Sequence, residues 1–452
     1  MPIDSNPQPA KEPTGPPGNL FVLALLTPIV GAVSGFLGAI FRLALADADR
    51  LRNELIVWAH GQKTVGFLLV TGSCAAATAI AAWLVRRYSP RASGSGVPDV
   101  EVVLEGELLD ESSFRLIPVK FVGGLLAIGS GLALGREGPS IQMGASTAHF
   151  VGKLFKRNWP DCRVLLAAGA GAGLATAFNA PIGGAIFVLE ELVKRFEPRA
   201  AIVALGASST AIVVARLLLG DAPDFHVQAF AFPSSLVNPL FFVLGALAGL
   251  AAIAYNHAIL GAIDMANRLS RWPVELRAAL IGAAVGTLAW FAPGLVGGGD
   301  PITQRTLDGA GTSALIPVLF LVRFGLGAVS YAAATPGGLF APLLVLGAQL
   351  GQLFGILCRF VFSGLNIRPQ AFAVVGMAAF FSGVVRAPLT GIVLVTEMTG
   401  NVTMLLPMLT ACFAAMLLPT LLRDAPIYDS LRERIVRTQE SDQEDDAGTN
   451  KT

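Results

Sequence analysis

Three glutamates that lie within apolar sequence are the residues of this chain best suited to do chemistry. Glu137 lies in GREGPS, between the apolar runs LLAIGSGLAL and IQMGAS, while Glu190 and Glu191 form the pair in FVLEEL. A carboxylate at membrane depth is costly and usually marks an ion path or a proton relay. The three could also be acid–base or metal groups of a membrane-embedded enzyme, although such sites usually gather His or Asp companions.

Histidine and cysteine do not supply those companions. The four histidines and four cysteines are scattered, with no CxxC pair and no zinc-type spacing. The run GAGAG at Gly169–Gly173 follows no predicted strand, so we expect close helix packing there rather than a nucleotide loop. We therefore predict that the chain is not an enzyme and binds no metal or other cofactor, and that its cysteines are small core residues: Cys74, Cys162, Cys358 and Cys412.

The elements that position the glutamates must be membrane helices. The chain is 54% hydrophobic and only 14% charged, whereas soluble domains carry about 25% charged residues. Apolar stretches of about the 20 residues needed to cross a bilayer recur along the chain. The short alternating segments of a membrane β-barrel are absent. The composition predicts an all-α polytopic membrane protein, with examples of such stretches at Phe21–Phe41, Val65–Val85, Leu236–Tyr255 and Met404–Leu422.

Both ends of the chain differ in composition from the apolar body. The N-terminus is polar and proline-rich, without the features of a signal peptide, and the C-terminus carries the acidic run QESDQEDDAG. We expect disordered tails at 1–19 and 437–452, with two transmembrane halves at 20–200 and 201–436. The net charge of +1 implies no polyanionic partner such as a nucleic acid.

An internal repeat divides the apolar body. Adding 203 to a position in the first half places GSGVP (Gly94–Pro98) on GGGDP (Gly297–Pro301) and Lys120 on Arg323. After a four-residue insertion, APIGGAIFVLE (180–190) aligns with APLTGIVLVTE (387–397). Paired halves whose membrane segments are interrupted by glycine and proline point to a transporter site near the middle of the membrane.

Three of the interruptions share one design, in which glycines precede a proline and then an apolar run. They are Gly94–Pro98, Gly135–Pro139 and Gly337–Pro342. Proline is favoured in the first turn of a helix, so each interruption predicts a helix N-terminus inside the membrane. Free N–H groups and the positive end of the helix dipole make such termini anion sites. A cation path would instead present rings of carbonyls or carboxylates.

At these interruptions the sequence closely resembles the CLC family of chloride channels and transporters. The motifs that carry the resemblance are GSGVP, GREGP, GGLFAP and the tyrosine in RDAPIYDS, and the likeness runs from about Phe21 to Arg437. It implies an inverted two-fold repeat of tilted, partly broken helices with an anion site at mid-membrane. It also implies a homodimer in which each subunit has a separate ion path.

The resemblance assigns anion-binding roles to four residues. Ser95 and Tyr428 would supply hydroxyls to a central chloride, and the backbone N–H groups of Leu339 and Phe340 would complete that site. Ser95 is similar to the serine of chloride-selective members, where nitrate-preferring relatives tend to have proline. The surrounding motif positions would support the site: Gly94, Gly96, Gly135, Arg136, Gly138 and Lys120.

The resemblance also assigns the protons. Glu137 would be the gating glutamate, whose carboxylate occupies the outer anion site when chloride is not there. Glu191 is similar to the inner proton-relay glutamate of the exchanger branch, a position where the channel branch typically lacks an acid. In the repeat, Glu137 corresponds to Phe340, Ser95 to Gly298 and Glu191 to Met398, so only the first half carries these polar groups.

Several residues have plainer interpretations beside these. Glu137 could pair with Arg136, although adjacent helical residues do not face each other. Glu191 could simply be solvated at a helix end. Glu190 corresponds to Glu397 in the repeat, so we expect a structural role for it. Lys120 and Arg323 could raise the local potential for anions or be satisfied structural charges, and the sequence leaves both open.

The sequence therefore predicts a secondary active antiporter that exchanges chloride for protons, both of which bind transiently. The alternative is a passive voltage- or pH-gated chloride channel of the same fold, and Glu191 favours the antiporter. Arg86, Arg87 and Arg91 before Gly94 suggest that their loop is cytoplasmic. The expected location is the lipid bilayer of a prokaryotic cytoplasmic (inner) membrane, with both termini in the cytoplasm.

Overall fold

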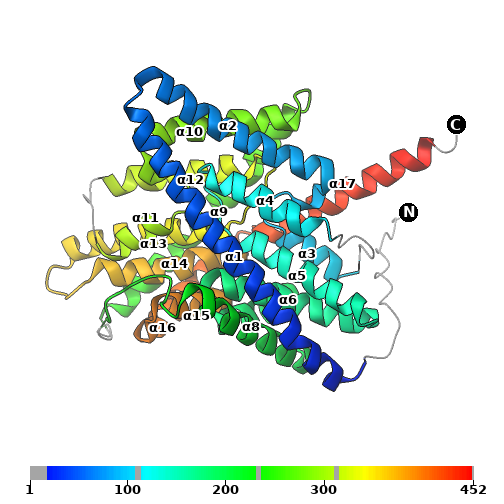
Figure 1. Ribbon diagram of the computed structural model, residues 1–452. Helices are drawn as coiled ribbons and strands as arrows, with labels where there is room; N and C mark the ends of the chain where they lie inside the picture. The colour runs from blue at the N-terminus through cyan, green and yellow to red at the C-terminus, as the bar shows by residue number, and fades with distance from the viewer. Residues whose placement is uncertain (1–17, 107–113, 231–235, 310–314, 450–452) are drawn as a thin grey trace, which may run out of the picture.

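The computed structural model describes residues 18–106, 114–230, 236–309 and 315–449, with side chains described as far as Thr438. Over these ranges the chain folds into α-helices joined by short turns, which agrees with the all-α prediction (Figure 1). The helices of the first half are α1 (Leu20–His60), α2 (Lys63–Tyr88), α3 (Val97–Leu104), α4 (Leu116–Gly129), α5 (Glu137–Leu154), α6 (Trp159–Phe178), α7 (Pro181–Phe187) and α8 (Pro198–Leu219).

The second half repeats this order. Its helices are α9 (Asn238–Arg268), α10 (Val274–Phe291), α11 (Asp300–Leu307), α12 (Ile316–Tyr331), α13 (Phe340–Val361), α14 (Pro369–Val385), α15 (Pro388–Thr399) and α16 (Leu405–Leu421), followed by α17 (Ile427–Thr449). Among the described helices, eight are long and apolar enough to cross a membrane. Large apolar side chains such as Leu25 and Phe36 on α1 point outward, as a lipid-facing surface requires.

Reciprocal contacts between the halves show how the repeat is arranged. The Glu190 carboxylate accepts hydrogen bonds from the N–H groups of Leu389 and Thr390 at 3.0 and 2.7 Å, at the start of α15. Glu397 does the same at the start of α7, where it accepts from Ile182 and Gly183 at 3.1 and 2.7 Å. Such an exchange of equivalent partners requires a two-fold relation between the halves. It also confirms the structural role expected for Glu190.

The packing of α8 places it with the first half. Helix α8 packs against α1, just as α16 packs against α9 in the second half. The boundary expected at residue 201 falls inside α8, which begins at Pro198.

Glycines let α5, α6 and α7 approach each other closely. A Cβ atom on Gly169 would lie 2.3 Å from the carbonyl oxygen of Gly144 on α5, and one on Gly173 would lie 2.1 Å from that of Ser140. A Cβ atom on Gly171 would contact Gly184 on α7 at 2.7 Å. The GAGAG run is thus a helix-packing element, as predicted. The four cysteines are free and buried, also as predicted.

The ends of the chain differ partly from the expected tails. Gly18 is held by Asp161, which accepts a hydrogen bond from its N–H at 3.1 Å, and residues 1–17 lie outside the described residues. Helix α17 continues past Arg437 to Thr449, so the segment expected to be disordered from residue 437 is helical over that range. It projects away from the helical body (Figure 1). Arg437 and Glu433 pair at 3.3 Å one turn apart, a spacing that stabilises an exposed helix.

Candidate functional site

The three glycine–proline interruptions come together in one place. Gly135 and Gly338 exchange two backbone hydrogen bonds of 2.8 and 2.7 Å, and they are equivalent residues of the repeat. Gly94 donates to the carbonyl of Thr335 and accepts from the N–H of Gly337, both at 3.0 Å. The local two-fold axis therefore passes between Gly135 and Gly338. The starts of α3, α5 and α13 converge there.

Glu137 is the first residue of α5 and is completely buried. Its Oε1 atom accepts a hydrogen bond of 3.1 Å from the N–H of Ala341, in the first turn of α13. Its Oε2 atom has no hydrogen-bond partner within the described residues. A negative oxygen thus lies at the N-terminus of a second helix, which is where a helix binds an anion.

Glycines leave the room that this carboxylate occupies. A Cβ atom at Gly135 would lie 2.1 Å from both carboxylate oxygens, and one at Gly338 would lie 2.6 Å from Oε1. A Cβ atom at Gly138 would lie 2.5 Å from the carbonyl oxygen of Ser95. Any side chain at Gly135 or Gly338 would displace the carboxylate from its place against α13.

Arg136 faces away from its neighbour Glu137. Its guanidinium binds Asp300 at 2.7 Å and Asp224 at 3.2 Å, and it donates to the carbonyl of Ala177 at 3.0 Å. Arg42 also pairs with Asp224. Two aspartates engage Arg136, which disfavours the interpretation of Glu137 as its ion-pair partner. Its role is to tie the start of α5 to α11 and to the segment that follows α8.

Two buried hydroxyls lie on the other side of the interruptions. Ser95, just before α3, is 1% exposed and Tyr428, in the first turn of α17, is 0% exposed. The two hydroxyls face each other, but neither forms a hydrogen bond of normal geometry within the described residues. Buried hydroxyls without partners are rare in proteins and favour a polar ligand. The structure thus brings Ser95 and Tyr428 together.

The start of α13 supplies backbone donors beside these hydroxyls. Leu339 caps α13 and Phe340 is its first residue, so the helix has no internal acceptors for their N–H groups. The Phe340 ring stacks on Tyr428 with ring centroids 6.2 Å apart and packs on Phe381 at 4.8 Å. These rings fix the orientation of the Tyr428 phenol. Phe340 therefore contributes both a backbone donor and the apolar wall of the site.

Lys120 and Arg323 have equivalent structural roles. Lys120 is buried on α4, and its ammonium donates to the carbonyls of Ala92 at 3.1 Å and Gly94 at 2.8 Å. Arg323 on α12 donates to the carbonyls of Leu295 and Gly297 at 3.0 and 2.8 Å. These carbonyls are equivalent in the repeat and precede α3 and α11. Each cation thus stabilises the conformation of a glycine-rich interruption. This favours the interpretation that both are satisfied structural charges.

Gly96 is needed for the conformation of its interruption. Its φ of +83° lies in the left-handed region that favours glycine. A Cβ atom there would also lie 2.4 Å from Oε1 of Gln142 on α5. A side chain at this position would therefore move Ser95 away from Tyr428.

Glu191 lies within a π-helical turn (Val188–Leu192) that follows α7, and only 5% of it is exposed. Helix α3, which carries Glu101, packs against this turn. Glu101 is 1% exposed, and neither of its carboxylate oxygens has a hydrogen-bond partner within the described residues. A short π-helical turn often marks a functional position. Two buried carboxyl groups, those of Glu101 and Glu191, therefore lie on neighbouring elements.

Glu101 was not predicted from the sequence. It lies in VPDVEVVL, five residues after Gly96. The sequence signal was a glutamate in an apolar helix that directly follows one of the glycine–proline interruptions. Lys194 approaches it, with 3.8 Å between the ammonium nitrogen and Oε1 of Glu101. Lys194 also pairs with Asp429 at 2.9 Å. Burial acts to lower the pKa of the Lys194 ammonium, but Glu101 and Asp429 together raise it above its usual value.

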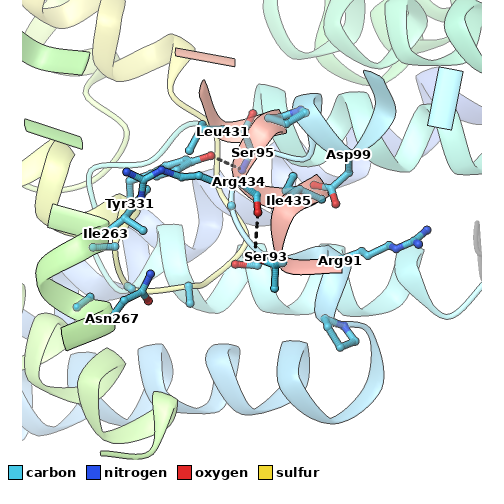
Figure 2. A pocket seen from close by; sticks show the side chains of 18 of the residues that line it. Arg91, Ser93, Ser95, Asp99, Ile263, Asn267, Tyr331, Leu431, Arg434 and Ile435 are labelled. Carbon is cyan, nitrogen blue, oxygen red and sulfur yellow. Dashed lines mark hydrogen bonds between the residues drawn. The ribbon is translucent and has the colours of Figure 1, made fainter. Parts of the chain in front are cut away.

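An open cavity of about 640 Å³ leads to Ser95 from the side of α17 (Figure 2). Its charged lining includes Arg91, Asp99, Arg277 and Arg434. Arg434 forms a two-pronged ion pair with Asp264 at 2.7 and 3.1 Å. The cavity gives water and small ions a route to Ser95. Within the described residues, no group of three or more His, Cys, Asp or Glu could hold a metal ion.

Comparisons with known proteins agree on one family. The family model described as voltage gated chloride channel matches residues 77–419. The H(+)/Cl(-) exchange transporter ClcA of Vibrio cholerae is 35% identical over 434 residues, covering 94% of this chain and 92% of that protein. The protein of the same name from Citrobacter koseri is 34% identical and covers 93% of this chain and 90% of its own length.

Solved structures show the same likeness. The crystal structure of a slow cyanobacterial Cl-/H+ antiporter superposes with a TM-score of 0.88 at 32% identity, covering 92% of this chain and 99% of that one. A CLC-type fluoride/proton antiporter superposes with a TM-score of 0.74 at 22% identity, covering 88% and 95%. The second likeness shows a shared fold.

Proposed function

The chain belongs to the voltage gated chloride channel family, and on that premise we propose that it is an antiporter that exchanges chloride for protons across a membrane. Relatives named as H(+)/Cl(-) exchange transporters, and a cyanobacterial Cl-/H+ antiporter of the same fold, support exchange over passive conduction. The buried Glu191 gives the same preference, since a channel needs no inner proton acceptor. The membrane is the cytoplasmic membrane of a prokaryote.

One observation carries the proposal. The Glu137 carboxylate lies at the N-terminus of α13 and accepts the Ala341 N–H, so it occupies a place suited to a small anion. Chloride and the carboxylate compete for this place. A chloride nearby disfavours the ionised carboxylate, and protonation in turn removes the attraction that holds the side chain there.

Chloride follows the polar groups between the cavity and Glu137. It passes from the cavity to the Ser95 and Tyr428 hydroxyls, and then to the N–H groups at the start of α13. These donors replace its hydration shell without a full positive charge, so the ion is stabilised and can still leave. When Glu137 is protonated it swings out, the chloride passes, and the proton moves with the side chain.

Protons reach Glu137 from the α17 side through Glu191. The Glu101 carboxylate beside Glu191, and the ion pair of Lys194 with Asp429, connect this buried pair with the surface. By linkage, protonation of Glu137 favours chloride binding as much as chloride favours protonation. Coupling follows from this reciprocity.

The orientation and assembly follow the family resemblance. We place the α17 cavity and both termini on the cytoplasmic side, because Arg91 lines the cavity, Arg86 and Arg87 shortly precede it in the chain, and positive residues are enriched in cytoplasmic loops. The protein forms a homodimer in the lipid bilayer, with one ion path per subunit. Chloride and protons are its only substrates, and no resident cofactor takes part.

The test is transport by the purified protein in liposomes. A chloride gradient is imposed, with valinomycin and potassium to set the voltage, and external pH and chloride are recorded together. We expect protons to move against their own gradient in a fixed ratio to chloride. Chloride flux without proton movement would show the passive channel instead. Absence of chloride flux in vesicles that contain folded protein would overturn both.

A further inference from the structure

A tyrosine that the proposed mechanism does not use lies at the inner end of the cavity. Tyr331 is the last residue of α12, is half-buried, and lines the cavity. Its hydroxyl oxygen accepts a hydrogen bond of 3.3 Å from the backbone N–H of Ser95, which is 236 residues away in the chain. Figure 2 shows this bond beside the α17 residues Leu431 and Arg434.

The position of the Tyr331 hydroxyl is tightly defined. A Cβ atom at Gly94 would lie 3.0 Å from this oxygen, so glycine permits the phenol to approach the interruption. The ring packs among residues of both large apolar clusters, which limits its movement. The hydroxyl is also close enough to Tyr428 to act on it electrostatically. Three hydroxyls, of Ser95, Tyr331 and Tyr428, therefore meet where the cavity ends.

The contact resembles the one that Glu137 makes on the opposite side of the site. Glu137 places an oxygen on the N–H of Ala341, and Tyr331 places an oxygen on the N–H of Ser95. Each N–H belongs to a glycine–proline interruption and is a donor that an anion could use. An oxygen acceptor thus covers a donor at both ends of the path.

We propose that Tyr331 is a gating residue on the cytoplasmic side, whose hydroxyl must leave the Ser95 N–H before chloride can pass from the cavity to the central site. This inference rests on the proposed function. A phenol carries no charge at physiological pH, so this step does not respond to pH in that range. Glu137 confers the pH dependence, and Tyr331 sets the resistance of the inner entrance.

The experiment measures chloride flux in liposomes in the Glu137→Gln background, in which the outer gate does not close. Tyr331→Phe keeps the ring and removes the hydroxyl, and so uncovers the Ser95 N–H. We expect flux to rise about 2- to 10-fold, the range for loss of one neutral hydrogen bond, by the same factor at every pH tested. Size-exclusion chromatography confirms that each variant is folded.

Tyr255→Phe is the matched control. Tyr255 is a fully buried tyrosine of α9 whose hydroxyl packs on Gly327 of α12, and it neither lines the cavity nor contacts Ser95. We expect this variant to leave flux unchanged. If Tyr331→Phe changes flux no more than Tyr255→Phe, or lowers it, the gating role is wrong.

A double variant tests whether Tyr331 acts through the Ser95 N–H. Proline has no backbone N–H, so the hydrogen bond cannot form in Ser95→Pro. Adding Tyr331→Phe to Ser95→Pro should then leave flux equal to that of Ser95→Pro alone. A rise as large as the one that Tyr331→Phe causes when Ser95 is present would overturn the mechanism. Lack of flux in Glu137→Gln itself would instead count against the proposed function.

Discussion

The Oε1 atom of Glu137 accepts a hydrogen bond of 3.1 Å from the N–H of Ala341, so the first residue of α5 caps the first turn of α13. Ala341 is the equivalent in the repeat of Gly138, the residue that follows Glu137. The carboxylate therefore lies beside the local two-fold axis, where two helix N-termini converge. A single anionic group at this point interacts with both halves of the protein.

Glu137→Gln should produce a chloride path that does not respond to pH. The amide has the shape of the protonated carboxyl group but cannot ionise, so it does not compete with chloride for the N-terminus of α13. We expect wild-type flux to rise as external pH falls, and the variant's flux to be flat and free of proton transport. The measurement is chloride efflux from liposomes over a series of external pH values. Proton pumping by the variant would contradict the gate assignment.

Glu191→Gln should separate protons from chloride. The side chain keeps its size but cannot exchange a proton, and removal of a proton-transfer group typically costs about 100-fold or more in that step. Chloride flux should persist. The control is Glu190→Gln next to it, which should stay coupled, because Glu190 caps α15. The measurement is simultaneous recording of pH and chloride. An unchanged proton-to-chloride ratio in Glu191→Gln would show that Glu191 is not part of the proton relay.

Ser95→Pro should shift preference from chloride toward nitrate. The change removes a hydroxyl donor and a backbone N–H from the central site, which disfavours the smaller and more strongly hydrated anion. Ser95→Ala removes the hydroxyl alone and should give a smaller shift. Competition flux with mixed chloride and nitrate measures the preference. If both variants retain the wild-type preference, Ser95 does not set selectivity.

Glu190→Ala and Glu397→Ala should lower stability by similar amounts. Each removes a carboxylate that accepts two backbone N–H groups across the two-fold axis, and Glu190 also accepts from the Thr390 hydroxyl at 2.7 Å. We expect the free energy of unfolding to fall by about 1–3 kcal/mol, with the larger loss at Glu190. Denaturant titration in detergent measures it. A large loss at one position with none at the other would contradict the reciprocal roles.

The sequence by itself determined the class, the duplication and the helix starts. Membrane helices are visible in composition because about 20 apolar residues are needed to cross a bilayer. The interruptions at Gly94, Gly135 and Gly337 are visible because glycine and proline act on the backbone locally. Glu137 could be singled out for the same reason, since a carboxylate at such an interruption stands out against its neighbours.

Only the tertiary structure decided which distant groups meet. The Tyr331 hydroxyl reaches Ser95 across 236 residues, and Lys120 reaches backbone carbonyls that precede α3. Glu101 was missed because its significance comes from its buried neighbour Glu191, on a segment that local sequence does not connect to it. Helix N-termini are specified by nearby residues, whereas the partners of a buried polar group depend on how whole helices pack against each other.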